Sequence, residues 1–130
     1  MIEFRVDARS GVPAYLQLVR QVEHAVRFGL LRAGDQLPTV KDVAGSLALN
    51  PNTVQKAYRE LDHRGLTEGR VGQGTFIQAG VTSQPTAGHA ATRRRLNRWV
   101  ETAIEAGLTD EDIEAMVAEA LRAARTRGAA

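Results

Sequence analysis

The sequence predicts a mainly α-helical fold with a small β-hairpin: an N-terminal winged helix-turn-helix followed by a C-terminal hairpin of two helices. Three observations support this prediction. Apolar residues recur at spacings of three and four in five segments, which is the period of an amphipathic helix. Between the third and fourth of these segments, residues 66–77 change to a period of two around a glycine-rich centre. A polar stretch without periodicity, residues 80–91, then separates a domain over 1–79 from a helical region over 92–127.

Composition limits the class of protein. The 130 residues, 43% of them hydrophobic, suffice for one compact core and a small accessory element. Lysine and arginine total 17 against 15 acidic residues, so the net charge of +2 does not by itself indicate a nucleic-acid partner. The sequence has no cysteine, which excludes disulfides and thiolate zinc sites. No stretch resembles a signal peptide or a membrane span, so we expect a cytoplasmic protein without a membrane partner.

The N-terminal region predicts an apolar segment and then a helix. Ile2, Phe4 and Val6 alternate with charged residues, so they form either a short edge strand or an arm that packs under the domain. Pro13 is suited to the first turn of a helix. The apolar positions that follow predict an amphipathic helix ending near Gly29: Tyr15, Leu18, Val19, Val22, Ala25 and Val26.

The next two helices are predicted to form a helix-turn-helix. A Leu-Pro pair at 37–38 cannot continue a helix, and Thr39 is then a suitable N-cap for a short helix that ends at the turn 48–49. An Asn-Pro pair at 50–51 starts the second helix, which is predicted over 51–64. Its buried face consists of Val54, Ala57, Tyr58 and Leu61. Its other face carries side chains that can hydrogen-bond to base edges or phosphates, namely Asn52, Thr53, Gln55, Lys56, Arg59 and His63.

A β-hairpin is predicted directly after the second helix. Residues 66–68 and 75–77 form its paired strands, and residues 69–74 connect them. Gly72 and Gly74 flank a glutamine, so the backbone at the tip can approach a narrow groove closely. A Gly-x-Gly loop alone is more often an ordinary turn, but its position behind a helix-turn-helix favours a wing.

The C-terminal region is predicted to form a helical hairpin that pairs with a second copy of the chain. Gly107 ends the first helix, and Thr109 with Asp112 forms an analogue of a capping box for the second. Two helices of this length cannot bury their own apolar stripes, so a homodimer is expected, with packing onto the N-terminal domain as the alternative. The side chains expected in the dimer interface are Leu96, Trp99, Val100, Ile104, Ile113, Met116, Val117 and Leu121.

Residues 1–79 resemble the DNA-binding domain of the GntR family of bacterial transcription regulators. Two segments carry the resemblance in order, spacing and content: PAYLQLVRQVEHAVRFGLLRAGDQLPTVKDVAGSLALNPNTVQKAYRELDHRGL and GRVGQGTFI. The short C-terminal region is similar to that of the YtrA-like subfamily, in which a two-helix segment of about this size serves for dimerisation. The resemblance therefore implies a regulator that binds DNA as a dimer.

The resemblance also implies which side chains contact DNA. Lys41 occupies a position where many relatives have a DNA-contacting arginine, and Gly72 corresponds to the glycine that relatives bring to the minor groove. Arginine is also absent at Pro51 and Gln55, where many relatives have it, so specificity would depend on Lys41 binding guanine acceptors and on Gln55 pairing with adenine. The full expected DNA-binding set is Lys41, Asn50, Asn52, Thr53, Gln55, Lys56, Arg59, Arg70, Gly72, Gln73 and Gly74.

Three functional hypotheses follow. The leading one is a homodimeric transcription regulator, expected to be a repressor, whose recognition helix 51–64 and wing 69–77 bind an inverted-repeat operator in double-stranded DNA. The second is a protein-interaction module that retains the helix-turn-helix scaffold without DNA affinity. The third, an enzyme, is the weakest, because no histidine pair has metal-ligand spacing; no catalytic residue, metal or cofactor is expected. An unidentified small-molecule effector would have to bind between subunits or between domains.

Overall fold

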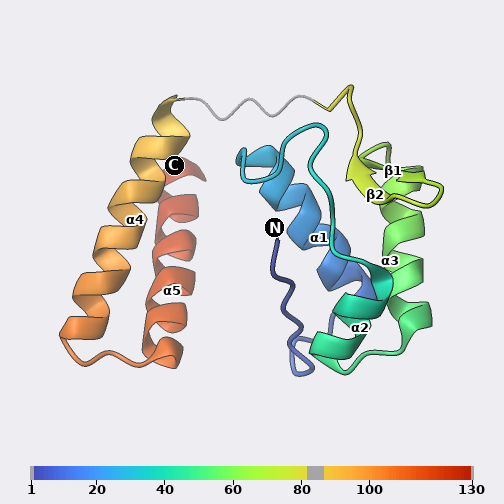
Figure 1. Cartoon of the computed structure of the whole chain (residues 1–130). Coiled ribbons are helices and arrows are strands. Elements are labelled where there is room, and N and C mark those ends of the chain that lie inside the picture. The colour runs from blue at the N-terminus through green and yellow to red at the C-terminus, as the bar shows by residue number, and fades with distance from the viewer. Residues whose placement is uncertain (1, 82–86, 130) are drawn as a thin grey trace. The chain divides into compact units, whose positions relative to one another are not determined.

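The structure, a computed structural model, describes residues 2–81 and 87–129. In this part of the chain, three helices and a hairpin are followed by two further helices (Figure 1). Contacts divide the chain into two units, Met1–Pro85 and Thr86–Ala130. The elements confirm the predicted fold class; their bounds are α1 (Ala14–Arg27), α2 (Val40–Leu47), α3 (Pro51–His63), β1 (Thr67–Arg70), β2 (Gly74–Ile77), α4 (Ala87–Glu105) and α5 (Asp110–Ala129).

Local signals fix the helix-turn-helix. The Oγ1 atom of Thr39 accepts a hydrogen bond from the N–H of Asp42 at 3.1 Å, which caps α2. The Oδ1 atom of Asn50 accepts one from the N–H of Asn52 at 2.9 Å, which caps α3. Between the two helices, Ala48 adopts a left-handed conformation with φ of 53°, which makes the turn tight. The capping signals read from the sequence are thus confirmed.

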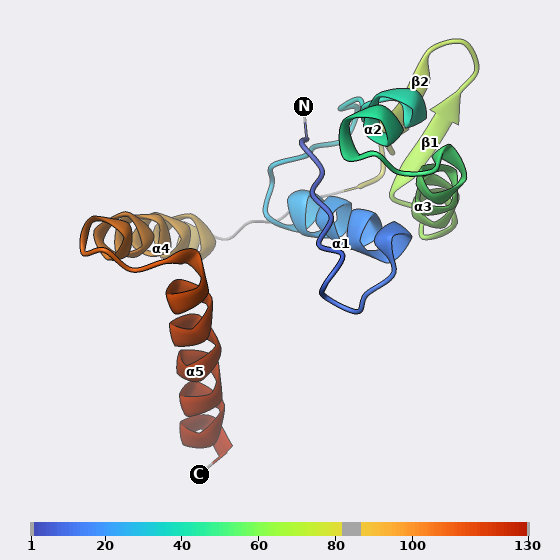
Figure 2. The ribbon, with the colours of Figure 1, turned by 90° about the horizontal axis from the view of Figure 1, so that it is seen from below.

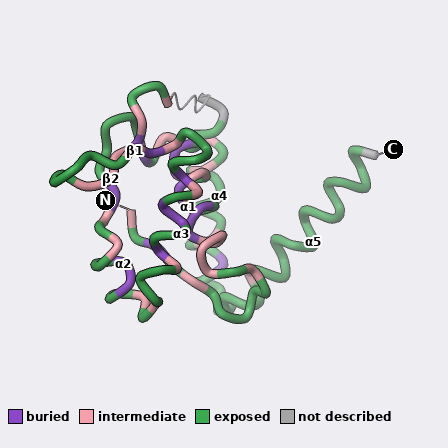
Figure 3. Tube along the Cα trace, turned by 90° about the vertical axis from the view of Figure 1, so that its right-hand side faces the viewer, coloured by how far each residue is buried: buried purple, intermediate pink, exposed green. Residues whose placement is uncertain are grey.

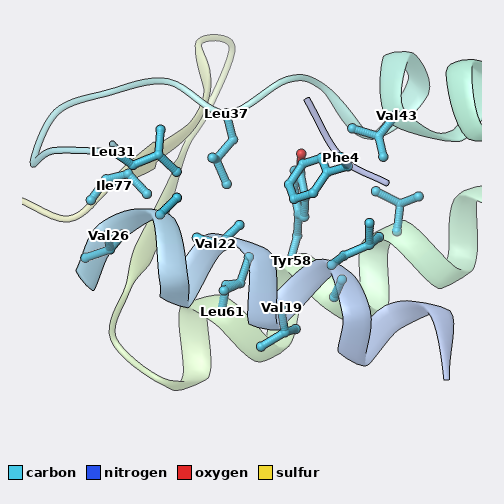
Figure 4. Packing of buried hydrophobic residues seen from close by; sticks show 14 of the residues in the cluster. Phe4, Val19, Val22, Val26, Leu31, Leu37, Val43, Tyr58, Leu61 and Ile77 are labelled. Atoms are coloured by element: carbon cyan, nitrogen blue, oxygen red, sulfur yellow. The ribbon is translucent and has the colours of Figure 1, made fainter. Parts of the chain in front are cut away.

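One hydrophobic core joins α1, α2, α3 and the hairpin (Figure 4). Helix α3 packs against both α1 and α2, so it lies at the centre of the first unit. The buried residues of α1 and α3 are those that helical spacing predicts, and Figure 3 shows them as the purple segments of those helices. The largest fully buried side chains are Leu18, Val19, Val22, Leu37, Val54, Leu61, Thr67 and Ile77.

A buried tyrosine ties α3 to the start of α2. The hydroxyl of Tyr58 donates a hydrogen bond to the carbonyl oxygen of Pro38 at 2.5 Å. Burial raises the pKa of Tyr58 above its usual range, and the nearby carboxylate of Asp42 raises it further. The phenol therefore stays protonated and keeps its hydrogen bond at physiological pH.

The N-terminal arm packs under the domain and is not a strand, which decides between the two alternatives for this segment. Phe4 is buried in the core. Gln21 accepts a hydrogen bond from the N–H of Arg5 at 2.9 Å and donates one to its carbonyl at 2.6 Å. Gln17 forms the equivalent pair with Asp7, at 2.8 and 2.9 Å. Two side-chain amides, one turn apart on α1, therefore take the place of a neighbouring strand.

The hairpin is longer at its tip than predicted and has an additional neighbour. Strands β1 and β2 pair antiparallel, with Arg70 opposite Gly74. Residues 34–37, where the sequence predicted only the break at the Leu-Pro pair, run along the other edge of β2. The N–H of Gly34 donates to the carbonyl of Ile77, and the N–H of Leu37 donates to that of Thr75, each at 2.9 Å. Strand β2 is therefore held on both edges.

The second unit differs from the predicted hairpin in two respects. Helix α4 begins at Ala87, so the predicted linker 80–91 is wrong over 87–91, where three alanines in five residues favour a helix; residues 82–86 of that linker lie outside the described residues. From the loop at Gly107, α4 and α5 diverge instead of packing along their lengths (Figure 2).

The cap of α5 is as predicted. The N–H of Thr109 donates to Oδ2 of Asp112 at 2.9 Å, and the N–H of Asp112 donates to Oγ1 of Thr109 at 3.1 Å, which is a reciprocal capping box. Within residues 2–81 and 87–129, no helix combines the length and apolar character needed to cross a bilayer.

Candidate nucleic-acid interface

The exposed face of α3 carries a stripe of polar side chains. Asn52, Gln55, Lys56 and Arg59 are all exposed, and their spacing of three, one and three places them on one side of the helix, away from the buried residues. Thr53 is half-buried beside the stripe. Among the described residues, the side chains of Gln55 and Arg59 have no hydrogen-bond or ion-pair partner, so both are available to a ligand.

Two other predicted contacts on α3 already have partners in the chain. The Oδ1 atom of Asn50 serves as the N-cap, so only its amide NH₂ remains to donate. The ammonium group of Lys56 lies over the ring of Tyr15, 4.1 Å from the centroid, in a cation–π contact. This contact holds the lysine at the N-terminal end of α1.

Lys41 lies in the first turn of α2 and is exposed. A positive charge there opposes the helix dipole, which costs about 0.3–1 kcal/mol at an exposed site. The side chain therefore does not stabilise its own helix. A nearby anion, such as a phosphate group, would offset the cost.

The wing presents an exposed tip (Figure 2). Gly72 and Gly74 have φ of 74° and 122°, in the region that only glycine adopts without strain. The N–H of Gln73 donates to the carbonyl of Arg70 at 2.9 Å and closes the turn. The side chain of Val71 is fully exposed at this tip. An open hollow of about 620 Å³ lies between the wing and Thr39.

Val71 lies in the predicted connection 69–74 and is not among the predicted contact residues. The available signal was a single apolar residue in a hairpin tip that is otherwise polar or glycine. Because its side chain is fully exposed, Val71 contributes no buried apolar surface to the stability of the fold.

Arg70 is less available than the sequence suggested. Its Nη2 atom lies 3.0 Å from Oε1 of Glu68, and its guanidinium stacks over the ring of Phe76 at 4.2 Å from the centroid. These contacts fix the side chain on the stem of the hairpin and neutralise part of its charge.

An ion-pair network fixes the C-terminal end of α3 to α1. Nε of Arg64 lies 2.9 Å from Oε1 of Glu60, and Nη1 of the same arginine contacts Glu23 of α1. The hydrogen bond to Glu60 is the main cause that raises the pKa of Arg64. The pairs are exposed and contribute little to stability, but they orient the helix.

The second unit leaves most of its predicted interface uncovered. Of that set, Leu96, Trp99, Ile104, Met116, Val117 and Leu121 are exposed, whereas Val100 and Ile113 are half-buried. Figure 3 shows α5 exposed along most of its described length. A hollow of about 480 Å³ between the diverging helices is lined by Leu96, Trp99, Met116, Val117, Ala120 and Leu121. A single copy of this unit therefore exposes an apolar face.

Features of a metal centre are not found in the part of the chain that the structure describes. No group of three histidine, aspartate or glutamate side chains lies close enough there to hold a metal ion. The polar groups gather instead on α3, at the start of α2 and on the wing.

Known proteins resemble the chain in both units. The family described as bacterial regulatory proteins, gntR family, matches residues 14–77. The HTH-type transcriptional repressor YtrA of Bacillus subtilis is 32% identical, over 88% of this chain and 89% of that protein. The HTH-type transcriptional regulator Rv1152 of Mycobacterium tuberculosis is 43% identical, over 83% of this chain and 85% of that protein. The crystal structure of a transcriptional regulator from Oenococcus oeni is 33% identical in sequence and matches with a TM-score of 0.54. The match covers 89% of this chain and 97% of that chain.

Proposed function

Because the chain belongs to the GntR family of bacterial transcription regulators, which bind DNA and are not enzymes, we propose that it is a homodimeric repressor of an inverted-repeat operator. The observation that carries the proposal is the polar stripe of α3, whose Gln55 and Arg59 side chains have no partner among the described residues. In this proposal residues 1–79 bind DNA and residues 92–127 form the dimer.

Helix α3 enters the major groove in the proposed complex. Gln55 pairs with an adenine edge, because its amide both donates and accepts, and Arg59 binds a phosphate. Lys41 reaches a phosphate or guanine acceptor from the first turn of α2, which offsets its unfavourable position against the helix dipole. Asn50, Asn52, Thr53, Lys56, Arg70 and, at the wing tip, Gln73 supply the remaining side chains that contact the duplex.

The wing lies in the adjoining minor groove. Gly72 and Gly74 allow the backbone on either side of Gln73 to approach the groove walls without a Cβ atom. The minor groove offers few base-specific contacts, so the wing responds mainly to groove width. Sequence specificity then depends chiefly on α3.

Dimerisation follows from the apolar face of α4 and α5. Six of the eight side chains proposed for the interface are exposed in a single copy, including Trp99 and Leu121. A second copy of the same face is a partner of matching chemistry, and an isologous interface gives two-fold symmetry. Two recognition helices related by that symmetry require an operator with inverted half-sites.

Repression is the proposed outcome of binding. The similar Bacillus subtilis protein carries the name of a transcriptional repressor. A dimer that covers two half-sites within a promoter blocks access of the polymerase to the same DNA. The expected target is the promoter of the gene that encodes the chain.

Paired substitutions test the proposal on that promoter and on a random duplex. Gln55→Ala should relax base preference at one position in each half-site, by about 1–3 kcal/mol of discrimination. Arg59→Ala should weaken both duplexes alike and reduce the slope of log affinity against log salt by about one. A wild-type protein that does not prefer the promoter over random duplex would contradict the proposal and favour an interaction module without DNA affinity.

A further inference from the structure

We propose that Gln36 is a positioning residue for the wing, and that it fixes the tip in the conformation that contacts the minor groove. This inference rests on the proposed function, since it assigns the wing to the minor groove. It adds a residue outside both the recognition helix and the wing, in the connection that precedes α2.

The backbone around Gln36 is anchored firmly. Gln36 forms an antiparallel bridge with Phe76 of β2. The residues on either side also bond to β2: the N–H of Leu37 donates to Thr75, and the carbonyl of Asp35 accepts from Ile77 at 2.8 Å. Because Leu37 and Ile77 are both fully buried, this segment moves only with the core.

From this fixed position, the Gln36 side chain reaches the wing tip. Its Nε2 donates a hydrogen bond to the carbonyl oxygen of Gln73 at 3.1 Å, across 37 positions of sequence. Gln73 is the residue between the two tip glycines. The bond uses the backbone of Gln73 and leaves its side chain free to face DNA.

The absence of a Cβ atom at Gly74 leaves room for the Gln36 amide. A Cβ atom at Gly74 would lie 2.8 Å from Nε2 of Gln36, which is closer than real Cβ atoms approach. At its φ of 122°, any residue other than glycine would be strained. The second tip glycine therefore accommodates the Gln36 amide in addition to allowing backbone approach to a groove.

The contact restricts the tip. Without it, the hydrogen bond from Gln73 to the carbonyl of Arg70 closes the turn but does not connect the tip to the core. A tip that samples several positions would lose conformational freedom on binding, and affinity falls accordingly. Gln36 restricts the tip in the free protein, so less conformational entropy is lost on binding DNA.

The test compares Gln36→Met with Gln78→Met. Methionine keeps the length of glutamine and removes the donor without adding charge. Gln78 is a matched control, because its Nε2 donates to the carbonyl of Thr67 at 2.9 Å, at the end of the hairpin remote from the tip. Each full-length variant is measured for affinity to the promoter duplex, hydroxyl-radical protection of its minor groove, and thermal unfolding midpoint.

We expect Gln36→Met to lower promoter affinity about twofold to tenfold, the worth of one hydrogen bond. Minor-groove protection under the wing should weaken, while the unfolding midpoint stays near wild type because the hydrogen bond is exposed. Gln78→Met should lower the midpoint and keep the minor-groove protection. Wild-type affinity and protection for Gln36→Met, or equal loss of protection in both variants, would overturn the inference.

A double-mutant cycle with Gln73→Ala separates positioning from direct contact. If Gln36 acts through the tip, Gln73→Ala costs less affinity in the Gln36→Met background than in the wild type. Additive losses would mean that Gln36 touches DNA itself, and would overturn the positioning role. Absence of promoter preference in the wild type, by contrast, refutes the proposed function before any variant is compared.

Discussion

Replacing Leu121 by alanine should weaken the proposed dimer by about 2 kcal/mol. In a single copy, Leu121 is 51% exposed. Full burial of a leucine stabilises by about 1.5–3 kcal/mol, so covering the exposed half contributes about 1 kcal/mol. A two-fold interface contains Leu121 twice, which gives about 2 kcal/mol and a roughly thirtyfold rise in the dimer dissociation constant.

Sedimentation equilibrium over a range of protein concentrations measures this change directly. Leu30→Ala is the matched control, because Leu30 is 66% exposed but lies in the first unit, outside the apolar face of α4 and α5. We expect the dissociation constant to rise for Leu121→Ala and to stay at the wild-type value for Leu30→Ala. Equal dissociation constants for the wild type and Leu121→Ala would refute the assignment of this face to the dimer.

Three further predictions concern single sites. Leu61→Ala should lower the free energy of unfolding of the first unit by about 2–5 kcal/mol in urea titration, because the side chain is fully buried; a loss below 1 kcal/mol would contradict that core. The pKa of Asp112 is lowered from 3.8 by the N–H and then the hydroxyl of Thr109, so the α5 cap is complete above that pH and is lost as pH falls below it. Thr109→Ala removes the hydroxyl and keeps the backbone N–H, so it should raise the Asp112 pKa part of the way toward 3.8 in an NMR titration, and an unchanged value would contradict the role of the hydroxyl. Arg70→Ala should reduce DNA affinity less than Arg59→Ala in a mobility-shift titration, because Arg70 is already paired; the reverse order would show that the pairing breaks on DNA.

The helix caps could be predicted because they depend on residues two or three positions apart. Asn50 with Asn52, and Thr109 with Asp112, form the bonds that their spacing indicates. The stripe of α3 was predictable for a similar reason, since a helical period alone separates its buried and exposed faces. These features required no knowledge of the rest of the chain.

Features that depend on distant residues were not predictable in this way. The contact of Gln36 with the wing and those of Gln17 and Gln21 with the N-terminal arm join segments 10 to 37 positions apart. The stacking of Arg70 on Phe76 also depends on hairpin register, which brings Phe76 opposite Glu68. Arg70 was predictable as a candidate, and its ion pair with Glu68 is local, but its stacking on Phe76 was not predictable.

The second unit shows a different limit. Residues 87–91 have no apolar period, which predicts a linker, yet their alanines favour a helix and α4 begins there. The angle between α4 and α5 depends on what fills the space between them. In the proposed dimer the residues that fill it belong to a second copy, and no pattern within one chain specifies the angle in that case.

The most direct test of dimeric operator recognition is the molar mass of the complex with the chain's own promoter duplex, by size-exclusion chromatography with light scattering. Two chains of 14.1 kDa per duplex are predicted. The complex should form in preference to one with a random duplex of equal length. One chain per duplex, or equal complex formation with both duplexes, would contradict the proposal.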